Sequence, residues 1–178
     1  MTGGSAGGLS TFLHLDHIAS RLPNTTARVV GKPNAGFFQD NFPIRSTATS
    51  PRWYNSSWPN EMQYAFSMFN SSGSLSRECQ SHYGPLHNWK CYLAPYAAPF
   101  INHSFFVLQS RFDQWQLSQE LRLPCMLKQN FFPPYHPSTC NGTERAAVVA
   151  YGDAQVEEHN GDVGGDVGGD VGGDVGGA

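Results

Sequence analysis

The chain has 178 residues, the length of one ordinary domain, and its 14 acidic and 11 basic residues give a net charge of −3. No cluster of lysine and arginine marks a nucleic-acid surface, so we expect no nucleic acid partner. No apolar run approaches the ~20 residues that a membrane-spanning helix needs, so we expect no membrane span.

The most informative segment is Gly-Gly-Ser-Ala-Gly-Gly at residues 3–8, directly before an apolar stretch. It fits a nucleophile elbow, in which a serine occupies a sharp strand-to-helix turn and small neighbours allow strand and helix to approach closely. Ser5 is then the nucleophile, and the backbone N–H of Ala6 is an oxyanion donor. The alternative is a plain glycine-rich helix start.

The stretch after this motif is predicted to be a helix that ends at Pro23. Its apolar residues spread around most of the helix, as expected for a helix buried against a sheet, and this favours the elbow. They are Leu9, Phe12, Leu13, Leu15, Ile18 and Leu22.

Further along the chain, strands and helices alternate. Residues 27–30 predict a short strand that runs into a turn at 31–36, and residues 42–57 predict a loop. Apolar residues at helical spacing predict a helix from Trp58 to Phe69, which either packs in the core or forms one wall of a substrate pocket. Residues 104–109 predict a buried parallel strand, followed by a helix near 114–121. We therefore expect an α/β fold with a mostly parallel sheet. The predicted nucleophile elbow favours a fold of the α/β-hydrolase type.

Asp113 follows the second predicted strand. Ligands and catalytic groups gather at the carboxyl ends of strands in open α/β sheets. In an esterase, this aspartate would orient a histidine and stabilise its imidazolium form. The alternative is that Asp113 caps the N-terminus of the following helix, and the spacing alone leaves both interpretations open.

The cysteines and the glycosylation motifs indicate a secreted protein. Of the three possible pairings of four cysteines, we favour Cys79 with Cys91 and Cys125 with Cys140, because each pair brackets a loop-like segment. The alternative is four buried free thiols. Asn-x-Ser/Thr motifs predict N-glycosylation at Asn24, Asn55, Asn70, Asn102 and Asn141.

Four segments in this order resemble the pectin acetylesterase and Notum carboxylesterase family. Residues 3–8 are similar to its G-x-S-A-G-G elbow, and residues 34–40 to its D-[SA]-G-x-F-x-D segment, with Asn34 in place of the first aspartate. Residues 88–92 resemble an aromatic-x-Cys segment, and residues 112–117 an aromatic-Asp-x-x-Gln segment. The resemblance implies that Ser5 is the nucleophile, Ala6 an oxyanion donor and Asp113 the triad acid.

Two parts of the family pattern have no counterpart in this sequence. The glycine-rich segment that supplies the other oxyanion donors would precede Met1, so we expect a truncated domain. The triad histidine should follow the acid in a Cys-x-x-His context, and only His136 and His159 follow Asp113. We expect a partial hydrolase domain at 1–155 and a disordered tail at 156–178, where Asp-Val-Gly-Gly is repeated.

The resemblance implies a serine carboxylesterase that deacetylates an O-acetylated cell-wall polysaccharide such as pectin, with this chain an incomplete form. One alternative is a Notum-like protein-lipid deacylase, and another is an inactive secreted glycoprotein fragment. We expect an ester substrate, a monomer, no cofactor and no metal site. The histidines before Asp113 form no metal-binding motif.

Overall fold

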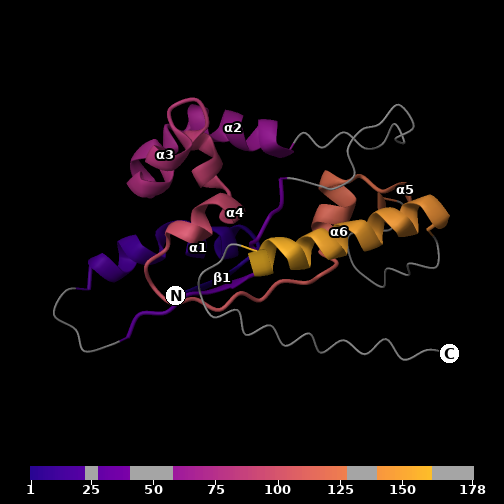
Figure 1. The fold of residues 1–178 in the computed structure, drawn as a ribbon, viewed down its shortest axis with the longest axis horizontal. Coiled ribbons are helices and arrows are strands. Elements are labelled where there is room, and N and C mark those ends of the chain that lie inside the picture. Colours follow the sequence, from indigo (N-terminus) through magenta and orange to yellow (C-terminus); the bar gives the residue numbers. More distant parts are fainter. Residues whose placement is uncertain (23–27, 41–57, 128–139, 162–178) are drawn as a thin grey trace.

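The structure is a computed structural model that describes residues 1–22, 28–40, 58–127 and 140–161. Its described part holds two short strands with a long helix between them, a group of short helices, and a long C-terminal helix (Figure 1). The strands are β1 (Thr2–Gly4) and β2 (Lys32–Asn34). The α-helices are α1 (Ala6–Ser20), α2 (Trp58–Met68), α3 (Arg77–Tyr83), α4 (Ala94–Ala97), α5 (Pro124–Leu127) and α6 (Gly142–Gly161). The 3₁₀-helices are η1 (Ser71–Ser74), η2 (Asn88–Tyr92) and η3 (Ala98–Phe100), and the π-helix is η4 (Gln116–Glu120).

The strands form a small parallel sheet. β1 and β2 pair in parallel, with Gly3 opposite Pro33, and α1 is the helix that connects them. On the other side of β2, Phe105 and Leu108 make parallel bridges, so residues 105–108 act as a third segment of the sheet. Because all three segments run in the same direction, their carboxyl ends lie at one edge of the sheet.

Parallel pairing near 104–109 is confirmed at Phe105 and Leu108, but as two isolated bridges and not as the buried continuous strand predicted, and Phe106 is 44% exposed. The strand predicted at 27–30 is wrong. Residues 28–30 are not paired as a strand, and the pairing begins at Gly31. The Gly-Lys-Pro-Asn sequence suggests a turn, yet Pro33 is accepted in β2 because its carbonyl oxygen receives the N–H of Leu108 at 2.9 Å. In this bond Pro33 is the acceptor, so it does not matter that proline has no N–H to donate.

Helix α1 covers the sheet only with its first part. Leu9, Phe12 and Leu15 are buried, but Ile18 is 39% exposed and Leu22 is 50% exposed, so the prediction that apolar residues all around the helix are buried is wrong for these two. The reason is length. A helix of 15 residues is about 22 Å long, whereas strands of three residues span only about 10 Å.

The N-terminus of α1 lies against the turn that follows β2, and glycines make this close approach possible. A Cβ atom on Gly8 would lie 2.6 Å from the carbonyl oxygen of Asn34 and 2.9 Å from the Cα of Gly36. A Cβ atom on Gly36 would overlap the backbone of Gly8 and Leu9. The two backbones therefore pack with no room for a side chain between them.

The helix predicted from Trp58 to Phe69 is confirmed as α2, which ends at Met68. Its first part packs in the core: the Trp58 ring lies 5.4 Å from Phe38 and 5.3 Å from Trp115, centroid to centroid. Phe69, just beyond the helix, is 67% exposed. Core packing thus accounts for the first apolar residues between Trp58 and Phe69 but not for the last.

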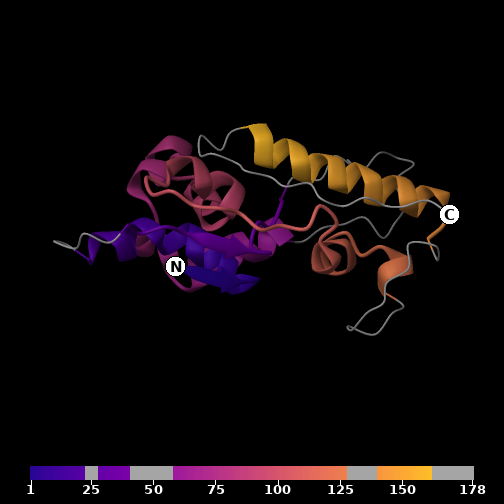
Figure 2. The same ribbon diagram turned by 90° about the horizontal axis from the view of Figure 1, so that it is seen from below.

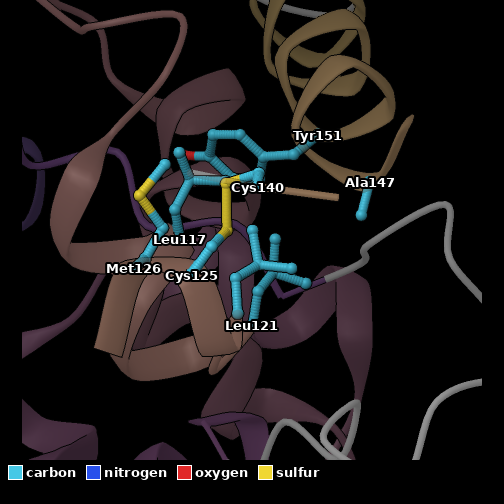
Figure 3. Close-up of a cluster of buried hydrophobic side chains, with 8 residues drawn as sticks. Leu117, Leu121, Cys125, Met126, Cys140, Ala147 and Tyr151 are labelled. Atoms are coloured by element: carbon cyan, nitrogen blue, oxygen red, sulfur yellow. A yellow bond between two sulfur atoms is a disulfide. The ribbon is translucent and has the colours of Figure 1, made fainter. Parts of the chain in front are cut away.

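A second cluster of buried side chains lies between η4, α5 and α6 (Figure 3). Its largest fully buried side chain is Tyr151 on α6, and the cluster attaches this long helix, which runs along one side of the molecule in Figure 2, to the rest of the structure. Its members are Leu117, Leu121, Leu123, Cys125, Met126, Cys140, Ala147 and Tyr151.

The cysteines form the two disulfides expected from the sequence. Cys79 is bonded to Cys91, with a Cα–Cα distance of 6.0 Å, and this bond joins α3 to η2. Cys125 is bonded to Cys140, with a Cα–Cα distance of 5.0 Å, and this bond joins α5 to the residues that lead into α6. Such bonds persist in oxidising compartments.

Some expected features lie outside the described residues, among them Pro23, Asn24, Asn55, His136, the loop at 42–57 and the repeats from 162 onward. Three glycosylation motifs lie within the described residues, and their asparagines, Asn70, Asn102 and Asn141, are exposed. None of the helices in the described ranges is both long and apolar enough to cross a membrane.

The glycine contact leads to a stability prediction. Gly8→Ala should lower the free energy of unfolding by about 1–3 kcal/mol, because the added methyl group meets rigid backbone. Gly7→Ala is the matched control: a Cβ atom there meets nothing within 4 Å, and alanine favours a helix over glycine by up to about 1 kcal/mol. Urea unfolding of both variants measures the difference. Equal effects of the two substitutions would contradict the packing described here.

The disulfides lead to a second prediction. Peptide mapping without reductant should recover Cys79 linked to Cys91 and Cys125 linked to Cys140, and reduction should cost about 3 kcal/mol per bond on the chain-entropy model. Alkylated free thiols in protein from a secretory host, or crossed pairs, would show that the pairing is different.

Candidate active site

Ser5 occupies the turn between β1 and α1, at the carboxyl end of the strand. Its φ of 54° and ψ of −123° are a strained conformation for a residue with a side chain, as a nucleophile elbow requires. Its backbone N–H donates to the carbonyl oxygen of Asn34 at 2.9 Å. Its side chain makes no capping hydrogen bond to α1, so the hydroxyl remains available for chemistry.

Ala6 is the first residue of α1, and it is exposed. The N–H groups in the first turn of a helix have no acceptor within the helix, and they carry the positive end of the helix dipole. No acidic side chain lies in the first turn of α1 to neutralise this positive end. The N–H of Ala6 is therefore suited to bind an oxyanion that forms beside Ser5.

Asp113 lies beyond the third segment of the sheet and is buried, at 7% exposure. Its Oδ1 accepts the backbone N–H of Gln116 at 3.0 Å, which is the bond of an N-cap residue, and its Oδ2 accepts the side-chain Nε2 of Gln109 at 2.9 Å. Capping therefore does occur. Because a carboxylate has about four acceptor sites, these two bonds leave capacity for a further donor.

The two glutamines connect Asp113 to the segment after β2. Gln109 Oε1 accepts the N–H of Phe37 at 3.1 Å, and Gln116 Oε1 accepts the N–H of Gln39 at 2.9 Å. Gln116 Nε2 donates in turn to the carbonyl oxygen of Phe37 at 3.2 Å. We call residues 34–39 the strap, since this segment contacts both Ser5 and the network around Asp113.

A further carboxyl group, Glu120, is buried near Asp113 at 3% exposure. Neither of its oxygens has a hydrogen-bond partner among the described residues. Burial, reinforced by the negative charges of Asp113, Asp40 and Glu61, raises the pKa of Glu120 to about 9. The group is therefore a neutral acid at pH 7. Burial also raises the pKa of Asp40, against the opposing effects of a 2.6 Å hydrogen bond from Tyr96 and of the charge on Lys90.

No histidine of the described residues hydrogen-bonds to Ser5 or Asp113. His103 is paired with Asp16, Nδ1 to Oδ1 at 2.7 Å. Burial opposes ionisation of Asp16, but hydrogen bonds from Asn102 and His103 outweigh it and lower the pKa of the carboxyl. His136 and the side chain of His159 lie outside the described residues.

A cavity of about 480 Å³ lies between α1, residues 73–76 and the segment from η2 to η3. Ser5, Ala6 and Asp113 do not line it. His14 does, and burial together with the neighbouring His17 lowers the pKa of this imidazole. The cavity thus belongs to the far end of α1 and not to the candidate site.

The potential metal ligands that cluster within the described ranges are Cys125, Cys140 and Glu144. Both sulfurs are bonded to each other, and Glu144 accepts the N–H of Asn141 at 2.8 Å. This group therefore offers no thiolate to a metal ion.

Comparison with known proteins identifies the family. The family model described as pectinacetylesterase matches residues 1–158, which is most of the chain. The chain belongs to the pectin acetylesterase family. By its description, this is a family of carboxylic ester hydrolases.

Individual members of the pectin acetylesterase family match part of their length. Pectin acetylesterase 11 of Arabidopsis thaliana is 29% identical over 121 residues, which are 68% of this chain and 28% of that protein. The palmitoleoyl-protein carboxylesterase Notum of Drosophila melanogaster is 28% identical over 120 residues, which are 66% of this chain and 16% of that protein. The chain thus spans under a third of the length of these relatives.

The solved structures show the same fold. The Wnt deacylase Notum from Drosophila superimposes with a TM-score of 0.61 at 26% identity, over 88% of this chain and 40% of that structure. A second crystal form gives a TM-score of 0.64 at 24% identity. The described part therefore has the α/β-hydrolase-like architecture expected from the sequence.

Family patterns also explain which site residues the sequence analysis found and which it missed. Ser5, Ala6 and Asp113 were named from motifs. Ser5 directly follows β1, and Asp113 comes five residues after the Leu108 bridge of the parallel third segment. Gln109 and Glu120 were missed, because neither belongs to a motif. Gln116 could have been found as the third residue after a capping aspartate, a pattern typical of helix starts. Asn34 contacts Ser5 through its backbone carbonyl, which an aspartate would supply equally well.

The raised pKa of Glu120 leads to a prediction about stability and pH. In the unfolded chain this carboxyl has its usual pKa near 4.5, so between pH 4.5 and about 9 only the folded state keeps the proton. The free energy of unfolding therefore falls as pH rises through this window, by up to about 1.4 kcal/mol per unit. Glu120→Gln should remove this part of the pH dependence and raise the urea midpoint at pH 8.

The control for this experiment is Glu157→Gln, which removes an exposed carboxyl from α6. Urea midpoints measured from pH 5 to pH 9 should follow the wild type in this variant. A Glu120→Gln protein with the same pH dependence as the wild type would show that Glu120 is ionised when folded.

Proposed function

We propose that this chain carries the nucleophile and the acid of a secreted serine carboxylesterase that removes acetyl groups from an O-acetylated polysaccharide such as pectin. The observation that carries the proposal is Ser5, held in a strained elbow at the carboxyl end of β1. The buried carboxylate of Asp113, which follows the parallel third segment of the sheet, supports it. Family membership and the two disulfides support it.

The proposed chemistry is acyl transfer. The Ser5 hydroxyl attacks the ester carbonyl while a histidine base takes its proton, and the oxyanion of the tetrahedral intermediate is bound by the N–H of Ala6. Asp113 orients the base and stabilises its imidazolium form. The sugar hydroxyl leaves with the proton from the base, and water then hydrolyses the acetyl-serine. Neither His136 nor His159 is assigned as the base.

A second candidate function is removal of a fatty acyl group from a protein. The structural match to the Wnt deacylase Notum favours it. The acetylesterase is preferred because the family model and the Arabidopsis relative carry that name. Esters of p-nitrophenol with acetate and with palmitate separate the two functions, since preference for the long chain would support the deacylase.

The decisive experiment is reaction of the full chain with a fluorophosphonate probe, with and without free imidazole as a substitute for the histidine side chain. Because loss of a triad member leaves roughly 10³-fold or more of catalysis over water, we expect slow labelling alone and faster labelling with imidazole. Ser5→Ala should abolish both. Ser20→Ala, at the exposed end of α1, is the matched control and should change neither.

Two results would overturn the proposal. Labelling that survives Ser5→Ala would place the reactive group elsewhere in the chain. A wild-type chain that stays unlabelled at every imidazole concentration would mean that the elbow does not produce a nucleophile. Asp113→Asn should keep the slow labelling and lose the response to imidazole, because the asparagine no longer stabilises the imidazolium ion.

A further inference from the structure

The hydrogen bonds around Asp113 restrict the orientation of its carboxylate. One donor, Gln109 Nε2, lies on the residue directly after the third segment of the sheet, and the other, the N–H of Gln116, lies on the following helix, η4. The two donors approach different oxygens of the same carboxylate. Rotation about the bond between Cβ and Cγ would break both hydrogen bonds, so the plane of the carboxylate is fixed.

The glutamines are themselves fixed. Gln116 faces an N–H with its Oε1 and a carbonyl with its Nε2, so its amide group has one possible orientation. Gln109 likewise accepts from Phe37 and donates to Asp113. Phe37, Gln39 and Gln116 are at most 1% exposed, and bonds made in such an interior are costly to leave unpaired.

The same strap also holds the candidate nucleophile. The carbonyl oxygen of Asn34 accepts the N–H of Ser5, and the N–H of Ala35 donates to Leu108 at 2.7 Å. Ser5 and Asp113 are therefore both connected by hydrogen bonds to the strap, Ser5 directly and Asp113 through Gln109. A change in the contact between Gln109 and the strap would move Asp113 relative to Ser5.

We infer that Gln109 is a positioning residue of the proposed carboxylesterase: its side-chain amide joins the Asp113 carboxylate to the strap and so sets the direction in which Asp113 meets the histidine base. The inference rests on the proposed function. Gln109 touches neither substrate nor the reacting atoms in this role. It acts through Asp113, and small errors in such an orientation cost rate.

The alternative is that Gln109 only stabilises the fold, and Gln109→Glu separates the two roles. The glutamate keeps an oxygen that accepts the N–H of Phe37, but it places a second carboxylate oxygen against Asp113 in place of the N–H donor. The contact with the strap survives while the contact with Asp113 becomes repulsive. Gln119→Glu is the matched control, because it makes the same charge change at an exposed glutamine of the nearby η4.

The first measurement is the labelling rate of Ser5 as a function of imidazole concentration. Gln109→Glu should reduce the acceleration by imidazole roughly tenfold to hundredfold, since a misdirected Asp113 no longer orients the base. Gln119→Glu should respond to imidazole as the wild type does.

The second measurement is a double-mutant cycle on urea unfolding with Asp113→Asn. In the double variant, the amide introduced at position 113 can donate to the carboxylate introduced at position 109, so stability should recover relative to Gln109→Glu. The response to imidazole should not recover, because the acid is gone. This combination is the signature of positioning and not of fold stability alone.

The outcomes distinguish the inference from the function on which it rests. A wild-type chain that imidazole accelerates, with Gln109→Glu accelerated equally, would overturn the positioning role alone. Absence of coupling between positions 109 and 113 would do the same, since it would mean that the hydrogen bond is not formed. A wild-type chain that never reacts at Ser5 would overturn both proposals.

Discussion

The contact between two backbones, the first turn of α1 and the strap after β2, is the constraint on which the rest of the described structure depends. Gly8 and Gly36 meet there without side chains between them. This close approach lets Asn34 receive the N–H of Ser5 and so holds the elbow at the end of β1. A helix displaced by one methyl group would separate Ser5 from the strap, and the geometry of the candidate site would change with it.

The strap then determines where polar groups can be buried. The N–H groups of Phe37 and Gln39 and the carbonyl of Phe37 bond to glutamine side chains and not to another strand. Gln109 reaches Asp113 with its side chain, and Gln116 reaches it with its backbone N–H. A segment of irregular backbone is thus kept in the interior by side-chain amides, which meet the requirement that buried polar groups be paired. The arrangement links fold and site through the same few hydrogen bonds.

Glu120 is the part of this arrangement that costs stability. It lies on a π-helix, a form that is frequent at functional sites, and its neutral carboxyl has no partner among the described residues. Its ionisation would add a fourth negative charge to those of Asp113, Asp40 and Glu61. Because the pKa of Glu120 is raised to about 9, this carboxyl stays neutral near pH 7 and adds no negative charge beside Asp113.

The sequence by itself determined the local features. The glycines around Ser5, the two cysteine pairs and the helix at Trp58 could be predicted, because each depends on residues that are near one another in the chain. Strand β2 could not be predicted, since Gly31, Lys32, Pro33 and Asn34 favour a turn. Pairing with β1 on one side and with Phe105 and Leu108 on the other makes them part of a sheet. The exposure of Ile18 likewise depends on how far the sheet extends beneath α1.

The candidate site divides in the same way. A motif identified Ser5 and Asp113, because the chemistry of each residue is visible in its immediate sequence. The role of Asp113 was left open between cap and acid, and only the tertiary structure showed that the cap bond is made while acceptor capacity remains. Gln109 and the buried Glu120 were beyond the reach of sequence, since their partners and their burial come from segments tens of residues away. The sequence therefore determined which groups could react, and the packing of the strap against α1 and η4 decided how they are held.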